Sequence, residues 1–321
     1  MKENNQSPLP SSFNSEQFKT EQRQRWDSVA EGWKEWWQTV EFAAQKVSDR
    51  LVELAQIKPG QKVLDIATGI GEPAVTAAKR LFPDYANKTG DNSNDNRNRG
   101  HVLATDISSE MLTIAKQRAT ELGLQDIIEF KEADAEMLEL SYSMFDAVLC
   151  RWGLMFMPNL NNTLSMILRA LLPGGRLACA VWAEASKVPF ISFPMNIVMH
   201  ELNVPPIPLG APGAFALADI GILQNSLSQV GFTNIQYERL NVTFEFPRVE
   251  DYINYTKDIG SMIKIMLSKE SAERQEEIWD IVTEQIRNNY TTVNNDDDNN
   301  KHPVRIDNEC ICISAKKPLQ L

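Results

Sequence analysis

The glycine-rich segment around Gly69 and Gly71 constrains the fold of this chain more than any other part of the sequence. It follows an apolar run, Lys62 to Ile66, of the kind expected for a buried parallel strand. The two glycines allow a tight turn and let a ligand approach bare backbone, while Glu72 and Pro73 suit the first turn of a helix. A strand, a glycine turn and a helix start in succession predict a cradle for a nucleotide-like ligand.

The spacing of the glycines fits two kinds of ligand. Gly69-x-Gly71-x-x-Ala74 matches the G-x-G-x-x-G/A fingerprint of dinucleotide-binding proteins. The acid before the turn gives a second pattern, Asp65-x-Ala67-x-Gly69-x-Gly71, which resembles the signature of class I S-adenosylmethionine-dependent methyltransferases. The rest of the chain has to separate these two interpretations.

Composition limits the classes of protein and partner. The 321 residues are 43% hydrophobic, which is enough for one large or two modest domains. The formal net charge of −11 argues against a nucleic acid as partner, and no apolar run reaches the roughly 18 residues of a transmembrane helix. The four cysteines and three scattered histidines lack the spacing of a zinc site. We therefore expect no metal, buried thiols and a cytoplasmic location.

Strand-like and helix-like patterns alternate from residue 59 to residue 183, which predicts βαβ units and a parallel sheet. The expected strands cover residues 62–66, 101–105, 127–131, 146–150, 176–181, 232–246 and 309–315. Helices are expected within residues 15–54 and over residues 73–80, 108–122, 161–171, 219–230, 249–267 and 271–289.

The chain also divides into segments of different composition. In order, they are a disordered tail at 1–14, a helical lid at 15–58, the ligand-binding core at 59–183, a cap insertion with a helix at 184–231, and C-terminal strands with inserted helices at 232–321, which complete the sheet. Within the core, the Asn/Asp-rich stretch at 83–100 is expected to form a disordered loop. The polar tail does not have the pattern of a signal peptide or membrane anchor.

Acidic residues follow several of the expected strands, where an open α/β sheet binds its ligands. Asp106 can accept hydrogen bonds from both hydroxyls of a ribose, and Asp134 can accept one from an adenine amino group beside the small Ala135. Asp65 can favour the ammonium group of a methionine tail, directly or through water. A carboxylate at the turn would repel the pyrophosphate of a dinucleotide, whereas three acids suit a cationic sulfonium ligand.

Ordered motifs make the resemblance to class I methyltransferases specific, in particular to the branch that contains the ubiquinone/menaquinone C-methyltransferases. The motifs are Asp65-Ile-Ala-Thr-Gly-Ile-Gly71, Ala104-Thr-Asp-Ile-Ser108, Glu132-Ala-Asp-Ala135, Phe145-Asp-Ala-Val148 and Leu172-Pro-Gly-Gly-Arg-Leu177. The resemblance covers roughly residues 26–182. It implies S-adenosylmethionine as cofactor and an α/β fold: a Rossmann-like, seven-stranded, mostly parallel sheet whose last strand is antiparallel, with N-terminal helices and a helical cap.

Matching positions carry the expected site of these enzymes onto this chain. The segment Trp26-Asp27-x-x-Ala30-x-x-Trp33 resembles their Tyr-Asp-x-x-Ala-x-x-Tyr lid helix. We expect lid or substrate roles for Trp26, Trp33, Trp37 and Trp152, with core packing as the alternative. The resemblance implies cofactor contacts at Asp65, Ala67, Gly69, Ile70, Gly71, Asp106, Ile107, Met111, Asp134, Ala135 and Arg151.

Two positions depart from the pattern of the quinone enzymes. Those enzymes carry Thr where Ile70 stands, and Ser or Asn where Arg151 stands. The longer, charged Arg151 is therefore either a ligand contact or a member of a structural ion pair.

Together these observations predict a methyltransferase that acts by in-line displacement on a small, apolar or aromatic acceptor, such as a quinone precursor or a related C, O or N acceptor. No residue stands out as a general base, and positioning and desolvation can supply much of the catalysis. A quinone acceptor would bring transient contact with a membrane. Two other functions stay open: an S-adenosylmethionine-binding protein that does not methylate, and an NAD(P)-dependent oxidoreductase, for which the sequence offers no proton relay.

Overall fold

The computed structural model describes residues 13–83, 100–138, 142–205, 210–291 and 303–319. The expected disordered stretches fall mostly outside these ranges, at residues 1–12 and 84–99. Asn14, which was expected to belong to the tail, instead caps the first helix, where its side chain accepts hydrogen bonds from the backbone N–H groups of Glu16 and Gln17 at 3.1 Å each. None of the described helices is long and apolar enough to cross a membrane.

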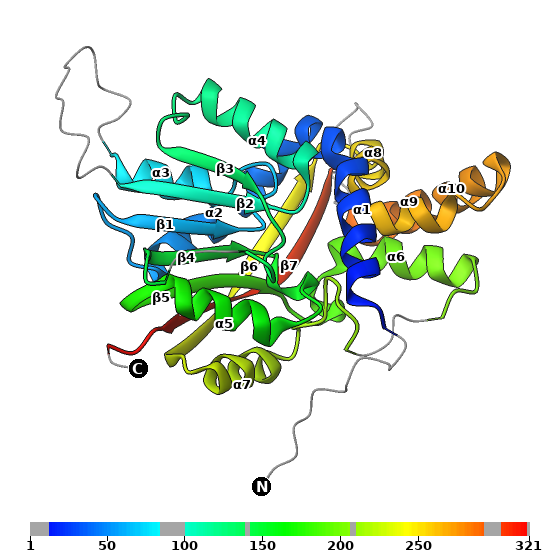
Figure 1. The fold of residues 1–321 in the computed structure, drawn as a ribbon. Helices are drawn as coiled ribbons and strands as arrows, with labels where there is room; N and C mark the ends of the chain where they lie inside the picture. Colours follow the sequence, from blue (N-terminus) through cyan, green and yellow to red (C-terminus); the bar gives the residue numbers. More distant parts are fainter. Residues whose placement is uncertain (1–12, 84–99, 139–141, 206–209, 292–302, 320–321) are drawn as a thin grey trace, which may run out of the picture.

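A seven-stranded sheet forms the centre of the fold, in the order β3-β2-β1-β4-β5-β7-β6 (Figure 1). Strand β7 runs antiparallel to both of its neighbours, and the other strands run parallel to one another. This confirms the expected Rossmann-like sheet. The strands are β1 (Lys62–Ile66), β2 (His101–Asp106), β3 (Ile128–Glu132), β4 (Phe145–Arg151), β5 (Leu171–Trp182), β6 (Thr233–Phe246) and β7 (Val304–Lys316).

Helices cover both faces of the sheet. On one face lie α2 (Trp37–Leu54), α3 (Ala74–Leu81) and α4 (Ser109–Glu121), and on the other lie α5 (Leu160–Ala170) and α7 (Ile220–Val230). Right-handed crossovers place the two sets of helices on opposite faces. From β1 the chain proceeds toward the edge formed by β3, and from β4 it proceeds toward the opposite edge. The central strands are therefore buried on both faces, and Val63, Leu64 and Ile66 have no exposed surface.

A second group of helices gathers beyond the carboxyl ends of the parallel strands (Figure 1). It consists of α1 (Ser15–Glu35), α6 (Pro189–Glu201), α8 (Val249–Ile259), α9 (Ser261–Leu267) and α10 (Ala272–Tyr290). Helix α1 crosses α8 closely at Gly32, where an added Cβ would lie 2.7 Å from the carbonyl oxygen of Asp258. We call α6, α8, α9 and α10 the cap. Helix α1 lies between α4 of the core and the cap helices α8 and α9, whereas α6 and α10 also pack directly on β7.

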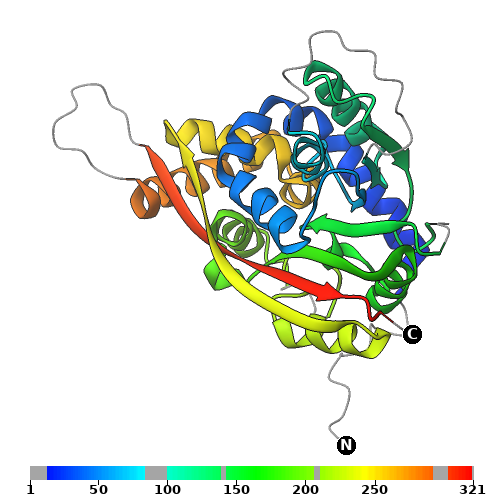
Figure 2. The ribbon, with the colours of Figure 1, turned by 90° about the vertical axis from the view of Figure 1, so that its left-hand side faces the viewer.

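Strands β6 and β7 extend past the sheet as a two-stranded ribbon that reaches the cap (Figure 2). Cys310–Lys316 pair with β5, whereas Val304–Glu309 pair with β6 beyond the end of β5. The expected strand at 309–315 was therefore too short. The outer half alternates, with Val304 and Ile306 buried and Arg305 and Asp307 exposed, because only one of its faces packs against the cap.

Some boundaries of the expected helices were also wrong. The helix expected over 249–267 is interrupted at Gly260, the last residue to bond back into α8, and continues as α9. Helix α3 begins at Ala74, so that Glu72 precedes the helix and Pro73 serves as its N-cap. The lid segment divides at Trp36, whose indole N–H donates to Asp258 at 2.7 Å while its ring packs on the cap.

Candidate functional site

The two glycines of the turn after β1 have different surroundings. Both have left-handed backbone angles, with φ of +56° at Gly69 and +104° at Gly71. An added Cβ on Gly71 would lie 3.4 Å from the Cβ of Ala115 on α4, so this glycine allows close packing of the turn against the helix. An added Cβ on Gly69 would meet nothing within 4 Å. Gly69 therefore presents bare backbone to open space, as a ligand cradle requires.

Asp65 holds this turn from beneath. Its side chain is completely buried, and one oxygen accepts hydrogen bonds from the hydroxyl of Thr68 at 2.6 Å and from the backbone N–H of Ala74 at 3.0 Å. Among the described residues, the other oxygen has no partner. Burial raises the pKa of Asp65 to about 8, although both hydrogen bonds and Arg151 act to lower it. The sequence did not reveal this structural role, and a contact with a ligand ammonium group stays a prediction for the free oxygen.

Asp106 joins the end of β2 to the same turn. One of its oxygens accepts from the backbone N–H of Gly69 at 2.8 Å, and the other accepts from that of Ser108 at 2.9 Å. Burial raises the pKa of Asp106, and these backbone donors oppose that effect. The structure therefore brings Asp106 and Gly69 together, as expected for one site. The contact with a ribose stays a prediction. It would use the lone pairs of this carboxylate that do not accept from Gly69 or Ser108.

Helix α1 is bound to the loops after β2 and β3 by polar contacts. The hydroxyl of Ser108 donates to Asp27 at 2.6 Å, and Arg23 donates to the carbonyl oxygen of Ile107 at 3.0 Å. The ammonium of Lys19 lies 2.8 Å from Asp134 and 2.8 Å from Glu136. Burial lowers the pKa of Lys19, but the two carboxylates outweigh it and raise this pKa above the usual range. Asp134, predicted to meet an adenine, thus contacts the lid in this structure.

The apolar face of α1 lies directly on the glycine turn. Val29 and Ala30 form a buried cluster with Ile70 of the turn and with Met111 and Ile114 of α4. Three tryptophans predicted as lid or substrate residues pack against this cluster: Trp26, Trp33 and Trp37. The structure therefore places the N-terminal helix over the expected cofactor position, with aromatic side chains at its margin.

Arg151 forms a structural ion pair, one of the two alternatives left open by the sequence. Its guanidinium donates to both carboxylate oxygens of Glu41, at 2.7 and 3.0 Å, and to the hydroxyl of Ser48 at 2.8 Å. Burial opposes the charge on Arg151, but Glu41 outweighs it and raises the pKa of the guanidinium. Both partners lie on α2, so this pair joins the end of β4 to the helix that covers the sheet.

Other buried charges accompany this pair. Glu72, beside the turn, accepts from the hydroxyl of Thr76 at 2.7 Å, and burial raises the pKa of Glu72 to about 7. Arg118 of α4 donates to the carbonyl oxygen of Ile70 and lies 4.5 Å from the ring centre of Trp37. Sequence reasoning missed these residues and Glu41. A charged residue among the apolar residues of a helix could have identified such a group, as at Glu41 among the buried residues of α2.

Trp152 follows β4 with a left-handed φ of 59°, which a bulky residue adopts only under constraint. Its ring stacks on that of Trp182, with ring centres 4.2 Å apart. The next residue, Gly153, is packed so tightly that an added Cβ would lie 2.6 Å from the Cβ of Ala67 in the turn. Trp152 is thus fixed next to the turn after β1.

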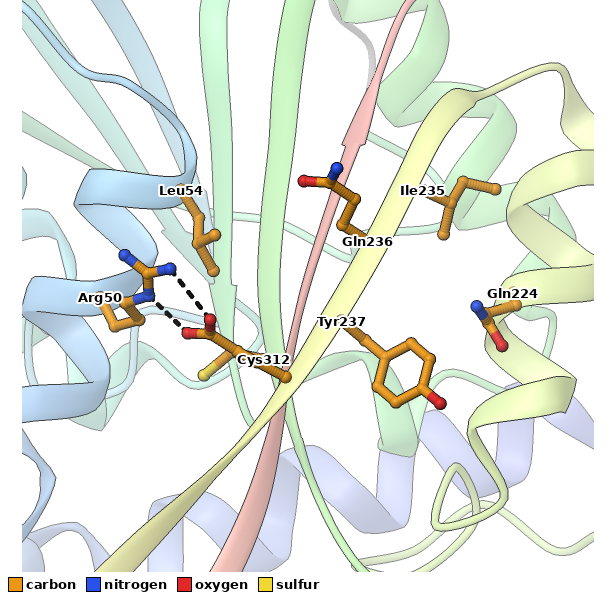
Figure 3. Close-up of a pocket in the computed structure, with 8 residues that line it drawn as sticks. Arg50, Leu54, Gln224, Ile235, Gln236, Tyr237 and Cys312 are labelled. Carbon is orange, nitrogen blue, oxygen red and sulfur yellow. Dashed lines mark hydrogen bonds and ion pairs between the residues drawn. The ribbon is translucent and has the colours of Figure 1, made fainter.

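A separate hollow lies away from these residues (Figure 3). It is open to solvent and runs along the first part of β6, where Arg50 of α2 forms an ion pair with Glu238. No residue predicted for the site lines it. The lining residues are Arg50, Leu54, Gln224, Ile235, Gln236, Tyr237, Glu238 and Cys312. This hollow therefore does not belong to the candidate site.

The fold and the turn define the class of protein. A glycine turn after β1 and a carboxylate after β2, at the carboxyl ends of the strands, are features of a Rossmann-like protein that binds a nucleoside-type ligand. The sequence model of the ubiE/COQ5 methyltransferase family matches residues 19–211, more than half of the chain. The chain belongs to this family.

Individual relatives agree with this family. The ubiquinone/menaquinone C-methyltransferase UbiE of Methylococcus capsulatus is 32% identical over 133 residues, which are 41% of this chain and 48% of that protein. Its counterpart from Bartonella quintana is 37% identical over 118 residues, 37% of this chain and 40% of that protein. The chain thus spans half or less of the length of these relatives.

Solved structures share the fold at low sequence identity. The YcgJ protein of Bacillus subtilis has a TM-score of 0.52 and 18% identity, over 85% of this chain and 99% of that one. Phosphoethanolamine N-methyltransferase 2 of Haemonchus contortus, in complex with phosphomonomethylethanolamine and S-adenosylhomocysteine, has a TM-score of 0.52 and 17% identity, over 97% of this chain and 62% of that one. These likenesses concern the fold alone.

Family membership supports S-adenosylmethionine as the cofactor. The residues present fit such a group, because Gly69 leaves open space beside the backbone and an oxygen of Asp65 is buried without a partner among the described residues. The alternative of an NAD(P)-dependent oxidoreductase receives no support from the family or from these relatives.

Proposed function

We propose that this protein transfers a methyl group from S-adenosylmethionine to a small apolar or aromatic acceptor, by C-methylation of a quinone precursor or by a related C-, O- or N-methylation. The observation that carries this proposal is the packing of α1, with Trp26 and Trp33 at its margin, over the glycine turn. An apolar, aromatic cover suits an acceptor of the same character. The UbiE relatives, named as quinone C-methyltransferases, support the choice of acceptor class.

The backbone at Gly69, Ile70 and Gly71 would hold the cofactor, with further contacts from Ala67, Asp106, Ile107, Met111, Asp134 and Ala135. When bound, S-adenosylmethionine supplies a methyl group on a positively charged sulfur. Three buried carboxyl groups, those of Asp65, Glu72 and Glu41, lie among two buried guanidinium groups, those of Arg118 and Arg151. A cationic ligand beside Asp65 would stabilise the ionised form of this acid, which burial disfavours.

The protein contributes positioning and the exclusion of water. Transfer of a methyl group is an in-line displacement, so alignment of the acceptor can supply much of the rate without a general base. The buried cluster of Val29, Ala30, Ile70, Met111 and Ile114 seals the turn against solvent when α1 is in place. We place the reaction in the cytoplasm, where the four free, buried cysteines would stay reduced.

Calorimetric titration tests the cofactor. We expect S-adenosylhomocysteine to bind with one-to-one stoichiometry and NAD to give no heat of binding. Binding of NAD without binding of S-adenosylhomocysteine would overturn the proposal. For the substitution Gly69→Ala, which should weaken binding of S-adenosylhomocysteine, Gly60→Ala is the matched control, because Gly60 also has a left-handed φ, of 86°, but lies outside the site, in the exposed turn before β1.

Transfer of labelled methyl groups tests the activity. A panel of quinols, phenols and amines of similar size is incubated with the protein and labelled S-adenosylmethionine. We expect label in at least one quinol or phenol product. Cofactor binding together with no labelled product across the panel would instead favour a binding protein that does not methylate.

A further inference from the structure

The indole of Trp152 holds a buried hydrogen-bond donor without an acceptor. Among the described residues, its Nε1 atom has no partner, and the same is true of Nε1 of Trp33 on the lid. Buried N–H groups of this kind are uncommon, because leaving one unpaired costs free energy that folding does not recover. A bound ligand would supply the acceptor that the protein does not.

The ring of this indole already contacts other side chains of the protein. One face stacks on Trp182, with the ring planes only 13° apart, and the guanidinium carbon of Arg151 lies 5.2 Å from the ring centre. Since Arg151 is itself fixed by Glu41, the ring is held by groups that do not depend on a ligand. Trp152 is thus poorly placed to stack on a substrate, but it has a rigid N–H edge.

Trp152 lies next to the glycine turn of the expected cofactor site. The backbone N–H of Trp152 donates to the carbonyl oxygen of Ala180, and the following Gly153 packs on Ala67 of the glycine turn. From the other side, Trp26 of the lid contacts Phe156, four residues after Trp152, with ring centres 5.5 Å apart. The ring centre of Trp33 in turn lies 6.5 Å from that of Trp26. Aromatic groups therefore connect the lid to the loop that follows β4.

We propose that Trp152 determines acceptor specificity by donating its indole N–H to an oxygen atom of the methyl acceptor. The inference rests on the proposed function and narrows its substrate class to an aromatic ring that bears a hydroxyl or carbonyl oxygen. Hydrogen-bonding sites of this type discriminate strongly against analogues without the oxygen, because the buried donor is then left unpaired.

Binding measurements test this proposal without requiring methyl transfer. The probes are 1-naphthol and 1-methylnaphthalene, which have similar size and differ in the oxygen. They are titrated into the protein saturated with S-adenosylhomocysteine. We expect about tenfold tighter binding of 1-naphthol by the unmodified protein, the size of one hydrogen bond to a buried donor. In Trp152→Phe, which keeps an aromatic ring but has no N–H, this preference disappears.

Trp279→Phe is the matched control, since it removes an indole N–H on α10, in the cap, and should leave the preference for 1-naphthol intact. An equal preference in Trp152→Phe and the unmodified protein would overturn the proposal, and so would the absence of a preference in the unmodified protein. Loss of binding of S-adenosylhomocysteine is scored separately, because that result concerns the proposed function. A general loss of packing in Trp152→Phe would weaken both probes alike and would also count against a hydrogen bond.

Discussion

Lys19 of the lid lies 2.8 Å from the carboxylate of Asp134 in the loop after β3. The same ammonium lies 2.8 Å from Glu136, so one cation on α1 is held between two acids of the core. Asp134 is also the residue expected to accept a hydrogen bond from the adenine amino group. The lid and the expected adenine position therefore share one carboxylate.

Replacement of Lys19 should loosen α1. In Lys19→Gln we expect amide hydrogen exchange over residues 15–35 to accelerate by about tenfold or more, because charge-assisted hydrogen bonds of roughly 1.5–3 kcal/mol are lost. Lys34→Gln is the control, since the partner of Lys34, Glu31, is largely exposed. Equal exchange in the two variants would show that Lys19 does not hold the lid.

Substitution of one member of the Glu41–Arg151 pair should destabilise the protein more than substitution of both. Glu41→Gln leaves the buried guanidinium without its counter-charge and should lower the free energy of unfolding by about 3–5 kcal/mol. The double variant Glu41→Leu/Arg151→Met should recover most of this loss, because apolar side chains of similar size need no partner. Denaturant unfolding measures both, with Arg248→Gln of the exposed Arg248–Asp251 pair as control. A double variant that is no more stable than Glu41→Gln would contradict the assignment.

Asp65 predicts a dependence of stability on pH. Burial raises its pKa to about 8 in the folded protein, whereas an exposed Asp titrates near 4. The folded state therefore binds a proton that the unfolded state releases, and stability must fall as the pH rises from about 4 to about 8. Between these two pH values, the free energy of unfolding should fall by about 1.4 kcal/mol per pH unit.

Asp65→Asn should flatten this slope, as measured by urea unfolding at pH 5, 6, 7 and 8. Asp49→Asn, at an exposed position on α2, should leave the slope unchanged. A slope that persists in Asp65→Asn would assign it to other groups, with Glu72 the next candidate because burial raises its pKa to about 7.

Gly69 and Gly71 should respond differently to substitution. Gly69→Ala meets no neighbouring atom, so its cost is limited to the left-handed backbone, roughly 1 kcal/mol. Its new methyl group occupies the space beside the turn, and we expect at least tenfold weaker binding of S-adenosylhomocysteine by calorimetry. Gly71→Ala contacts Ala115 and should lower the thermal unfolding midpoint further. Unchanged affinity in Gly69→Ala would place the cofactor elsewhere.

The parts of the site predicted from sequence are those in which neighbours along the chain determine the geometry. Gly69 and Gly71 belong to one strand-turn-helix unit, so their roles in the turn can be inferred from local rules, whereas the hydrogen bonds by which Asp65 holds the turn were not predicted. The unpredicted parts join distant residues: Glu41 meets Arg151, and Lys19 meets Asp134. Spacing does not identify such pairs, because they depend on how helices are placed on the sheet. The same reason explains why the sequence left open the role of Arg151.

The extension of β7 was missed for a different reason. Its outer residues alternate between buried and exposed, while its inner residues are nearly all buried. One strand thus carries two burial patterns, and the sequence predicts a strand only over the inner, mostly apolar residues. The break at Trp36 depends likewise on a contact with Asp258, far away in the sequence.

The position of β7 affects how the chain reaches its final state. Because this strand, built from residues 304–316, lies between β5 and β6, β6 has no partner strand and β5 has only β4 until those residues are synthesised. A nascent chain without them exposes the open edges of two long strands, and such edges pair readily with other chains. Insertion of β7 therefore covers the free edge of β5 and gives β6 its partner strand.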